Sequence, residues 1–396
     1  MRTNSHSPSS STRTRRRAIV AVAALAATIA SVGVTAAASA SPTVKSRWRG
    51  TKTTTTTVAP AQTAPAPSTP TTTAPRPTTT VAPSPTTTAP APSTTTTAPA
   101  PAPTPNTASA GSVLFGAATP GGPWDLSGLS TLEADAGKRV SLYVYYQSFA
   151  FNPNFDAAAA NAVRARGAVP MITWEPWDPS AGTVAQPAYS LANIASGSHD
   201  AYINRWASQI KAWGQPLWLR FAHEMNGDWY PWAEGVNGNT PGQYVAAWRH
   251  VHDLFRQAGV TNVTWVWSPN VSDRPLAGLY PGDAYVDWVG VDGYNWGTTA
   301  SWSAWQTPSQ VFGATLANLR SVSSRPIVIA ETASTEIGGN KAQWIQQFFS
   351  MLSANPDIRA FVWFNFNKET DWRIQSSSGA RTAFAAGVAD PRYGSA

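Results

Sequence analysis

The feature that most constrains the fold of this chain is a series of eight short apolar runs, all beyond residue 112, separated by longer stretches of mixed polarity. The runs are six or seven residues long and almost continuously apolar, with many β-branched and aromatic side chains. This texture is typical of strands that are buried on both faces. They cover residues 113–118, 140–146, 169–174, 217–222, 263–268, 288–294, 326–331 and 360–366.

Helical patterns lie between these runs, at residues 156–166, 200–213, 241–258, 308–322 and 341–353, and Thr240 is placed to cap the third of them. Strands that alternate with helices over about 280 residues match the pattern and size of an α/β protein with a (β/α)8 TIM barrel. An open doubly wound sheet is the alternative. The first run is followed by no glycine-rich phosphate fingerprint, which disfavours that alternative. We therefore predict a TIM barrel over residues 112–396.

The first forty residues have the features of an export signal. Arginines precede an apolar stretch at 18–37, and Ala38-Ser39-Ala40 fits the small-x-small pattern of a cleavage site. We therefore predict a signal peptide at residues 1–40. An uncleaved membrane anchor is the alternative, because about twenty apolar residues are long enough to span a bilayer.

Residues 41–111 consist mainly of Thr, Pro, Ala and Ser, a composition that cannot bury a core. They predict a disordered, semi-rigid linker. With the export signal, this linker predicts a secreted, extracellular protein, or one tethered to the cell envelope through its N-terminal segment.

Charge and cysteine content exclude several classes of function. Residues 1–111 hold ten Lys and Arg and no acidic residue, whereas the rest holds eighteen basic and twenty-one acidic residues. The basic isoelectric point therefore belongs to the N-terminal segment, and we expect no nucleic-acid partner for the barrel. The chain has no cysteine, which rules out disulfides and thiolate metal sites.

Polar and aromatic residues gather where several apolar runs end, which is where a TIM barrel carries its active site. The third run leads into Trp174-Glu175, and the fourth leads into His223-Glu224. The sixth run contains Asp292 and Tyr294, the seventh ends on Glu331, and the eighth contains Trp363.

A metal-dependent or serine-dependent reaction is disfavoured. A zinc motif that begins at His223 would need a second histidine at position 227, which is glycine. The chain also has no G-x-S-x-G nucleophile motif. We expect neither a metal nor a cofactor.

The remaining candidate chemistry uses the two glutamates, Glu224 and Glu331. In an eight-stranded barrel, the ends of the fourth and seventh strands face each other across the mouth. Two such carboxyls suit glycoside hydrolysis, and a retaining mechanism requires them about 5–5.5 Å apart. A single glutamate at a strand end is more often in a salt bridge or a helix cap, but two beside His, Tyr and Trp favour catalysis.

Tryptophan content also indicates a sugar substrate, because flat aromatic rings stack on pyranose faces. Eighteen of the nineteen tryptophans lie after residue 111. Several of them occupy helical faces or strand interiors and are expected in the core. The tryptophans that follow strand ends are candidates for substrate contact: Trp177, Trp229, Trp232 and Trp296.

The segment RFAHEMNGDWYPW, residues 220–232, resembles the R-P-x-H-E-M-N-G-x-W-F-W-W pattern of glycoside hydrolase family 26. This family contains β-mannanases and related β-glucanases and β-xylanases, which are retaining (β/α)8 enzymes. The resemblance implies that Glu224 is the general acid/base and Glu331 the nucleophile. It also implies that His223 contacts the sugar near the cleaved bond and that Trp229 lines the site.

The resemblance extends to other strand ends. It implies that the hydroxyl of Tyr294 orients the nucleophile, with Asp292 beside it. It implies that Trp363 forms an aromatic floor beneath the sugar and that Arg220 keeps the nucleophile ionised.

The chain departs from the family pattern at Phe221-Ala222 and Tyr230-Pro231. Trp174 and Glu175 are candidates for a subsite that differs from that of a standard mannanase. These departures affect the identity of the sugar rather than the class of reaction.

The leading hypothesis is a monomeric, secreted, retaining endo-β-glycosidase acting on a polysaccharide, with β-1,4-mannan first. Mixed-linkage β-glucan is the second substrate and β-1,3-xylan the third. A different class of function is a non-catalytic carbohydrate-binding barrel at the cell surface. The presence of both glutamates argues against that class.

Overall fold

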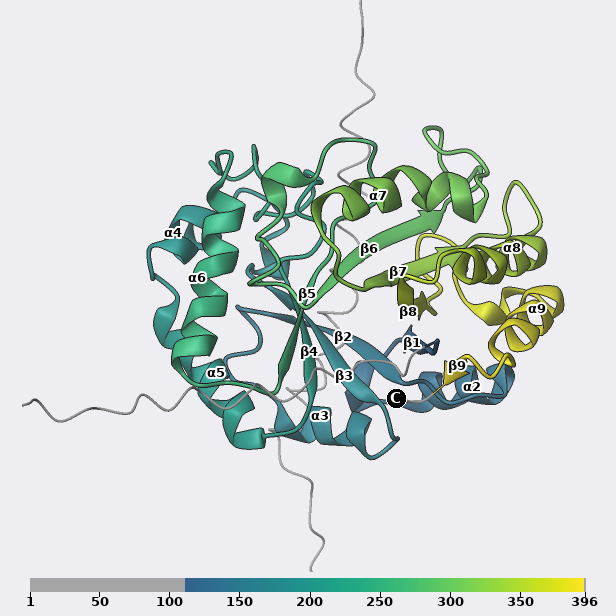
Figure 1. Cartoon of the computed structure of the whole chain (residues 1–396), viewed down its shortest axis with the longest axis horizontal. Coiled ribbons are helices and arrows are strands. Elements are labelled where there is room, and N and C mark those ends of the chain that lie inside the picture. The colour runs from purple at the N-terminus through teal and green to yellow at the C-terminus, as the bar shows by residue number, and fades with distance from the viewer. Residues whose placement is uncertain (1–110, 395–396) are drawn as a thin grey trace, which may run out of the picture. The chain divides into compact units, whose positions relative to one another are not determined.

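Eight parallel strands close into a barrel in the computed structural model, and helices cover its outside (Figure 1). The structure describes residues 111–394. The predicted signal peptide and all but the last residue of the predicted linker lie outside these residues. Among the described helices, none combines the length and apolarity needed to cross a membrane.

All eight predicted strands are present, and the predicted TIM barrel is confirmed. The strands are β1 Val113–Ala118, β2 Leu142–Ser148, β3 Val169–Glu175, β4 Leu217–Phe221, β5 Val263–Trp267, β6 Trp288–Asn295, β7 Ile327–Ser334 and β8 Ile358–Phe364. They pair in chain order, and β1 closes the barrel by pairing with both β8 and β2. A two-residue strand, β9 Tyr393–Gly394, adds a short parallel pairing to β1.

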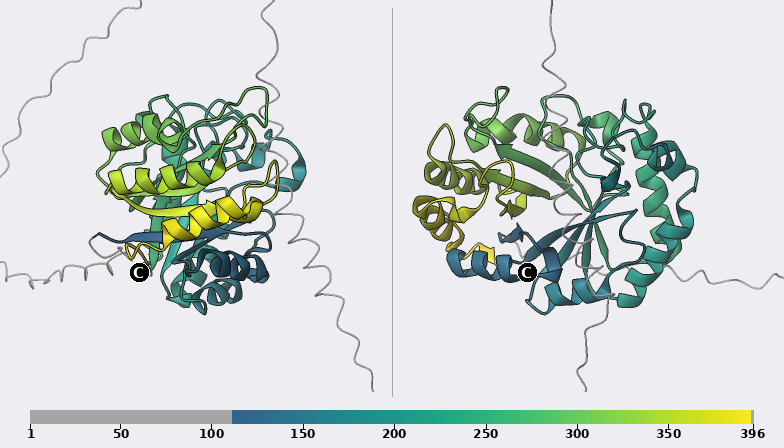
Figure 2. Two further views of the ribbon diagram at one scale, coloured as in Figure 1. Left: turned by 90° about the vertical axis from the view of Figure 1, so that its right-hand side faces the viewer. Right: turned by 180° about the vertical axis from the view of Figure 1, so that it is seen from behind.

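The helices are α2 Ser127–Ala136, α3 Ala157–Arg164, α4 Leu191–Ala195, α5 Asp200–Trp213, α6 Gln243–Gln257, α7 Pro308–Val322, α8 Lys341–Ala354 and α9 Ser378–Val388. Single 3₁₀ turns are η2 Gly122–Trp124, η3 Pro179–Ala181, η4 Pro187–Tyr189, η5 Ala277–Leu279 and η6 Ile374–Ser376. Figure 2 shows the same elements from the side and from behind.

The five predicted helices are confirmed within a few residues, and α2, α4 and α9 were not predicted. The predicted capping role of Thr240 is wrong. Gly242, with φ of 86°, is the N-cap of α6, and the Glu234 carboxylate accepts from the backbone N–H groups of Gly242 and Tyr244 at 2.7 and 3.4 Å. By contrast, Thr307 is the N-cap of α7 and forms a complete capping box. Its hydroxyl accepts from the backbone N–H of Gln310, and the Gln310 side chain accepts from the backbone N–H of Thr307.

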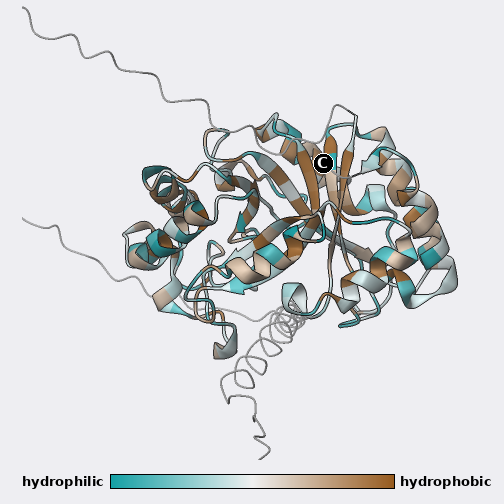
Figure 3. Ribbon diagram, turned by 90° about the horizontal axis from the view of Figure 1, so that it is seen from below, coloured by the Kyte–Doolittle hydropathy of each residue, from teal (hydrophilic) through white to brown (hydrophobic). Residues whose placement is uncertain are grey.

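The core lies inside the barrel and between the barrel and its helices. Nearly every strand residue is buried, as a strand covered on both faces requires. Figure 3 shows hydrophobic residues along the strands and more hydrophilic residues on the outer helices. Large aromatic side chains fill the layer between strands and helices; Trp174 on β3, for example, stacks on Trp206 of α5 with ring centroids 4.9 Å apart.

Candidate active site

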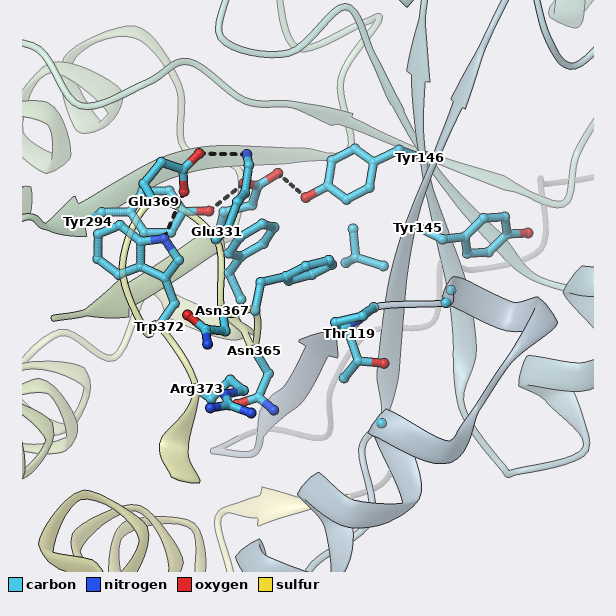
Figure 4. Close-up of a pocket in the computed structure, with 18 of the residues that line it drawn as sticks. Thr119, Tyr145, Tyr146, Tyr294, Glu331, Asn365, Asn367, Glu369, Trp372 and Arg373 are labelled. Carbon is cyan, nitrogen blue, oxygen red and sulfur yellow. Dashed lines mark hydrogen bonds and ion pairs between the residues drawn. The ribbon is translucent and has the colours of Figure 1, made fainter. Parts of the chain in front are cut away.

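A cavity of about 1060 Å³ lies where the strands end and the strand-to-helix loops begin. Six of the candidate residues selected from the sequence line it: His223, Glu224, Trp229, Tyr294, Trp296 and Glu331. Figure 4 shows part of its wall, with Glu331 between Tyr146 and Tyr294. The structure therefore brings the two glutamates into one cavity.

The segment that carries Glu224 has a strained backbone. Strand β4 ends at Phe221, and Ala222 and Glu224 then adopt φ of 45° and 51°, a conformation that side-chain-bearing residues rarely adopt. Such strain persists only where the surrounding structure holds it, and it is common at active sites.

Four hydrogen bonds to other parts of the chain hold this turn. The backbone N–H groups of Ala222 and Glu224 donate to the carbonyls of Trp174 and Ser268, at 3.0 and 2.7 Å. The Tyr244 hydroxyl donates to the Ala222 carbonyl at 3.1 Å. The Trp232 indole N–H donates to the His223 carbonyl at 2.6 Å. The barrel thus fixes the direction in which Glu224 leaves the end of β4.

The glycine of the HEMNGDW motif makes room for Trp229. A Cβ at Gly227 would lie only 2.5 Å from the indole of Trp229, so a larger residue would displace that ring. In its observed position the indole N–H donates to Glu224 Oε2 at 2.7 Å. Asn270, beyond β5, donates to Glu224 Oε1 at 2.6 Å.

Glu224 is suited to carry a proton at neutral pH. Burial and the negative charge of Glu331 raise its pKa to about 7, although the donors Asn270 and Trp229 act in the opposite direction. A carboxyl with such a pKa can give a proton to a leaving group and later take one from water.

Glu331 is held ionised. Burial by itself would raise its pKa, but the guanidinium of Arg220 and the hydroxyl of Tyr294 outweigh burial and lower the pKa to about 2. Arg220 pairs with Glu331 Oε1, Tyr294 donates to Oε2 at 2.6 Å, and Tyr146 donates to Oε1 at 2.7 Å. Tyr294 and Arg220 thus both contact Glu331, and their roles in orienting a nucleophile and keeping it ionised stay predictions.

Arg220 lies beneath the cavity and connects three strands. It is fully buried, and its Nη1 donates to both oxygens of Asp292 on β6 at 2.9 and 2.7 Å. Its Nε donates to Thr173 on β3 at 3.0 Å. Asp292 also accepts from Ser268 at 2.9 Å. Asp292 therefore positions Arg220 rather than contacting a substrate in the cavity.

His223, Asp292 and Glu331 also place one possible metal-ligating atom each within 4.8 Å of one another. The Arg220 guanidinium already pairs with both of these carboxylates. A positively charged group therefore occupies the position between them that a cation would take.

His223 is neutral, because burial and the charge of Arg220 hold its pKa well below the usual value. Its ring packs against Tyr230, with centroids 4.9 Å apart, and Tyr230 stacks on Trp232 at 4.2 Å. These rings form an aromatic wall beside Glu224.

Trp174 and Trp363, two predicted substrate-binding residues, point away from the cavity. Trp363 is fully buried and packs against Phe384 of α9 and Trp344 of α8, so its predicted place beneath the sugar is corrected. Its neighbour Phe364 lines the cavity instead, because successive side chains on a strand point to opposite faces. Trp174 faces α5 for the same reason.

Glu175 points inward but remains beneath the cavity surface. It is 1% exposed and accepts a hydrogen bond from Trp177 at 3.3 Å. Burial raises its pKa to about 8, which favours the protonated form at neutral pH. Trp177 and Trp232 are also fully buried, so neither presents a free ring to a substrate.

Sequence reasoning missed several residues of the site. Tyr146 contacts Glu331 and Asn270 contacts Glu224. Tyr146 is the last residue of the second apolar run and Asn270 lies two residues beyond the fifth, which was a usable signal. The loop after β8 also lines the cavity with Asn365, Asn367, Lys368, Glu369, Trp372 and Arg373.

The comparisons with known proteins agree on one family. Residues 188–355 match the family model described as glycosyl hydrolase family 26. Endoglucanase H of Acetivibrio thermocellus is 43% identical over 277 residues, which cover 67% of this chain and 30% of that protein. The β-1,3-xylanase TXYA of a Vibrio species is 26% identical over 206 residues, with 46% and 42% covered.

A third relative is the mannan endo-1,4-β-mannosidase A and B of Caldalkalibacillus mannanilyticus. It is 38% identical over 87 residues, which cover 21% of this chain and 17% of that protein. The matches thus span less than half the length of each of these three relatives.

Solved structures support the fold. A GH26 β-mannanase from Bacteroides ovatus superposes with a TM-score of 0.54 at 18% identity, covering 71% of this chain and 90% of that chain. A modular endo-β-1,4-mannanase from Cellulomonas fimi superposes with a TM-score of 0.54 at 19% identity, covering 71% of each chain.

Proposed function

We propose that this chain, whose barrel belongs to glycosyl hydrolase family 26, is a retaining endo-β-glycosidase that cleaves a β-linked polysaccharide. The feature that carries this proposal is the placement of two glutamates of very different proton affinity in one cavity. The pKa of Glu224 is raised to about 7 and that of Glu331 is lowered to about 2. An acid and a nucleophile that face one bond need this difference.

In the first step, a carboxylate oxygen of Glu331 attacks the anomeric carbon. The bond from this carbon to the glycosidic oxygen breaks, and that oxygen takes the proton of Glu224. The products are a shortened polysaccharide and a glycosyl ester on Glu331. Tyr294 donates to Oε2 of Glu331 and Tyr146 to Oε1, which orients the attacking carboxylate.

In the second step, Glu224 is a carboxylate and removes a proton from water. The water oxygen attacks the anomeric carbon, the ester bond breaks, and Glu331 regains its charge. Two inversions at one carbon retain the β configuration. Formation of the ester removes the negative charge of Glu331, which lowers the pKa of Glu224. Glu224 is then ionised, as the base of the second step requires.

Two substrates have separate support. The likeness to Endoglucanase H extends over 277 residues, which cover 67% of this chain, and favours a β-glucan, mixed-linkage glucan included. The mannosidase match covers 87 residues and supports β-1,4-mannan. We place β-glucan and mannan as the first two glycans to test and β-1,3-xylan third.

The test uses Glu224→Ala and Glu331→Ala with aryl glycosides that carry a good leaving group. Each variant should lose hydrolysis of the polysaccharide by roughly a thousandfold. Added azide should restore turnover in both variants by entering the space of the missing carboxyl. The Glu331 variant should release an α-glycosyl azide and the Glu224 variant a β-glycosyl azide.

Asp228→Asn is the matched control, because Asp228 is an exposed carboxylate in the same loop as Glu224. It should hydrolyse at the wild-type rate. Full activity in either glutamate variant would overturn the proposal. A wild-type chain that binds glycan gels without hydrolysis would instead support the non-catalytic carbohydrate-binding barrel.

We also propose that the protein acts outside the cell as a monomer, either free or tethered to the envelope. The arginine-led apolar stretch and the Ala38-Ser39-Ala40 pattern support export. N-terminal sequencing of the protein from culture medium should begin after Ala40. A product that stays with the membrane fraction and retains Met1 would favour the anchor.

A further inference from the structure

Three large hydrophobic side chains are exposed among the described residues, and two of them line the cavity. Trp302 is 51% exposed and Trp124 is 38% exposed, and both belong to the cavity wall. Ile337 is also 51% exposed and lies outside this wall. Both exposed tryptophans of the described barrel thus lie at the mouth of one cavity.

Trp302 is held by a hydrogen-bonded loop between β6 and α7. Asn295 Oδ1 accepts from the backbone of Gly297 and of Gln306, at 3.2 and 3.0 Å, and so ties together both ends of the loop. Ser303 accepts from the Ala300 backbone at 3.2 Å. The Trp302 ring meets that of Trp296 edge-on, with centroids 5.3 Å apart. The loop therefore presents Trp302 in a defined position despite its exposure.

Trp124, the last residue of η2 in the segment after β1, is also held in a defined position. Its indole N–H donates to Asp156 Oδ2 at 3.0 Å, and its ring meets Tyr145 edge-on at 5.8 Å. A Cβ at Gly122 would lie 3.1 Å from the six-membered part of the indole, so glycine allows the close approach. The ring orientation is set by the protein before any ligand arrives.

Neither tryptophan touches the catalytic pair. Trp302 is separated from Glu331 by Trp296 and Tyr294, and it is Tyr294 that donates to the carboxylate. Tyr145, the ring partner of Trp124, lies across the cavity from Tyr294 and Trp372 (Figure 4). The two exposed rings therefore lie in different parts of the cavity rim.

We propose that Trp302 and Trp124 are stacking platforms for sugar units that lie beyond the cleaved bond. A fixed aromatic face offers a large apolar contact at little cost in side-chain entropy, and the ring of a β-linked pyranose presents a matching apolar face. The ligand class is an extended β-glycan rather than a disaccharide. This assignment rests on the proposed glycosidase function, and it explains why the chain would prefer long substrates to short ones.

The kinetic test compares mixed-linkage β-glucan and β-1,4-mannan with the shortest oligosaccharide of each that is cleaved. In Trp302→Ala and Trp124→Ala, kcat/KM on the polysaccharide should fall about tenfold more than on the short oligosaccharide. The loss should appear mainly in KM. Trp302→Phe should recover part of it because a smaller flat ring remains. Ile337→Ala removes an equally exposed apolar side chain outside the cavity and should change neither value.

The binding test does not depend on hydrolysis. Affinity electrophoresis through gels that contain each glycan is run in a Glu331→Ala background, so that the glycan stays intact. Trp302→Ala and Trp124→Ala should each reduce retardation, and Ile337→Ala should not. Equal losses on short and long substrates, or unchanged retardation, would overturn the platforms while leaving the glycosidase proposal intact. If the wild-type chain hydrolyses no glycan but its retardation still depends on these tryptophans, the platform proposal stands and the glycosidase proposal is overturned.

Discussion

Glu224 and Glu331 are the same kind of residue, and their neighbours give them different pKa values. Glu224 lies among neutral donors and near another carboxylate, whereas Glu331 accepts from a guanidinium and two phenols. The difference arises at the level of individual contacts. It also explains why Arg220 lies fully buried beneath the cavity, since an ion pair with Glu331 compensates that burial.

This charge difference predicts the pH dependence of activity. Glu224 must carry its proton to act as an acid, so kcat/KM should fall as the pH rises through about 7. Glu331 must be ionised, so activity should persist on the acid side until the pH nears about 2 or the protein unfolds. The measurement is a pH–rate profile of kcat/KM on the polysaccharide.

An aryl glycoside whose leaving group needs no proton is the control for this profile. The fall in rate above neutral pH should disappear for the step that forms the glycosyl ester, because that leaving group departs without a proton from Glu224. A polysaccharide rate that stays constant well above pH 7 would contradict the assignment of Glu224 as the acid.

Residue-level prediction from the sequence succeeded where a motif was specific and failed on side-chain direction. HEMNGDW identified His223, Glu224 and Trp229, which all line the cavity. Trp363 was selected where Phe364 lines the cavity. A strand that is buried on both faces has no polar alternation to show which residues point inward. The contacts of Tyr146 with Glu331 and of Asn270 with Glu224 could not be predicted, because they depend on how separate strands lie next to one another.

At the scale of elements, the first residue of α8 connects this helix to the loop after β8. Lys341 is fully buried, and its ammonium donates to the carbonyls of Asp371 and Arg373 at 3.0 and 2.7 Å and to Ser376 Oγ at 2.9 Å. The same loop carries Trp372 and Arg373 into the cavity wall. One lysine thus links the packing of a helix to the shape of the site.

We expect Lys341→Met to destabilise the protein by about 1–3 kcal/mol, because three buried acceptors lose their donor. KM for the polysaccharide should rise with it as the loop loosens. Urea unfolding followed by tryptophan fluorescence measures the first effect and steady-state kinetics the second.

Lys211→Met is the matched control for this prediction. Lys211 is exposed on α5 and donates to one carbonyl, that of Ala258, at 2.8 Å. Its loss should change the free energy of unfolding by less than about 0.5 kcal/mol. Equal effects of the two substitutions would show that Lys341 does not act through its buried acceptors.

At the scale of the whole barrel, closure depends on the pairing of β1 with both β8 and β2. Gly116 lies at this closure and pairs with Val362 on one side and Leu142 on the other. A Cβ at this position would lie 2.9 Å from Val362 Cγ2 and 3.1 Å from the Phe361 carbonyl. The backbone at the closure of the barrel leaves no room for a side chain.

Gly116→Ala should therefore lower the free energy of unfolding by about 1–3 kcal/mol, through overpacking. Gly313→Ala, on the exposed face of α7, has nothing within 4 Å of the added Cβ. It should stabilise the protein by up to about 1 kcal/mol, because alanine favours the helix. Denaturant unfolding of both variants provides the comparison, and effects of the same sign would contradict this account of the closure.

The sequence by itself determined the barrel, five of its helices and the motif that carries Glu224. These features depend on local patterns: apolar runs of strand length, helical periodicity and one continuous motif of contiguous residues. The tertiary structure decided the direction of Trp363, the place of Asp292 beneath the cavity and the donors to Glu331. It also brought Trp302 and Trp124 to one cavity rim from loops about 180 residues apart in the chain. Strand register and barrel closure bring such distant residues together, and a local pattern carries no information about either.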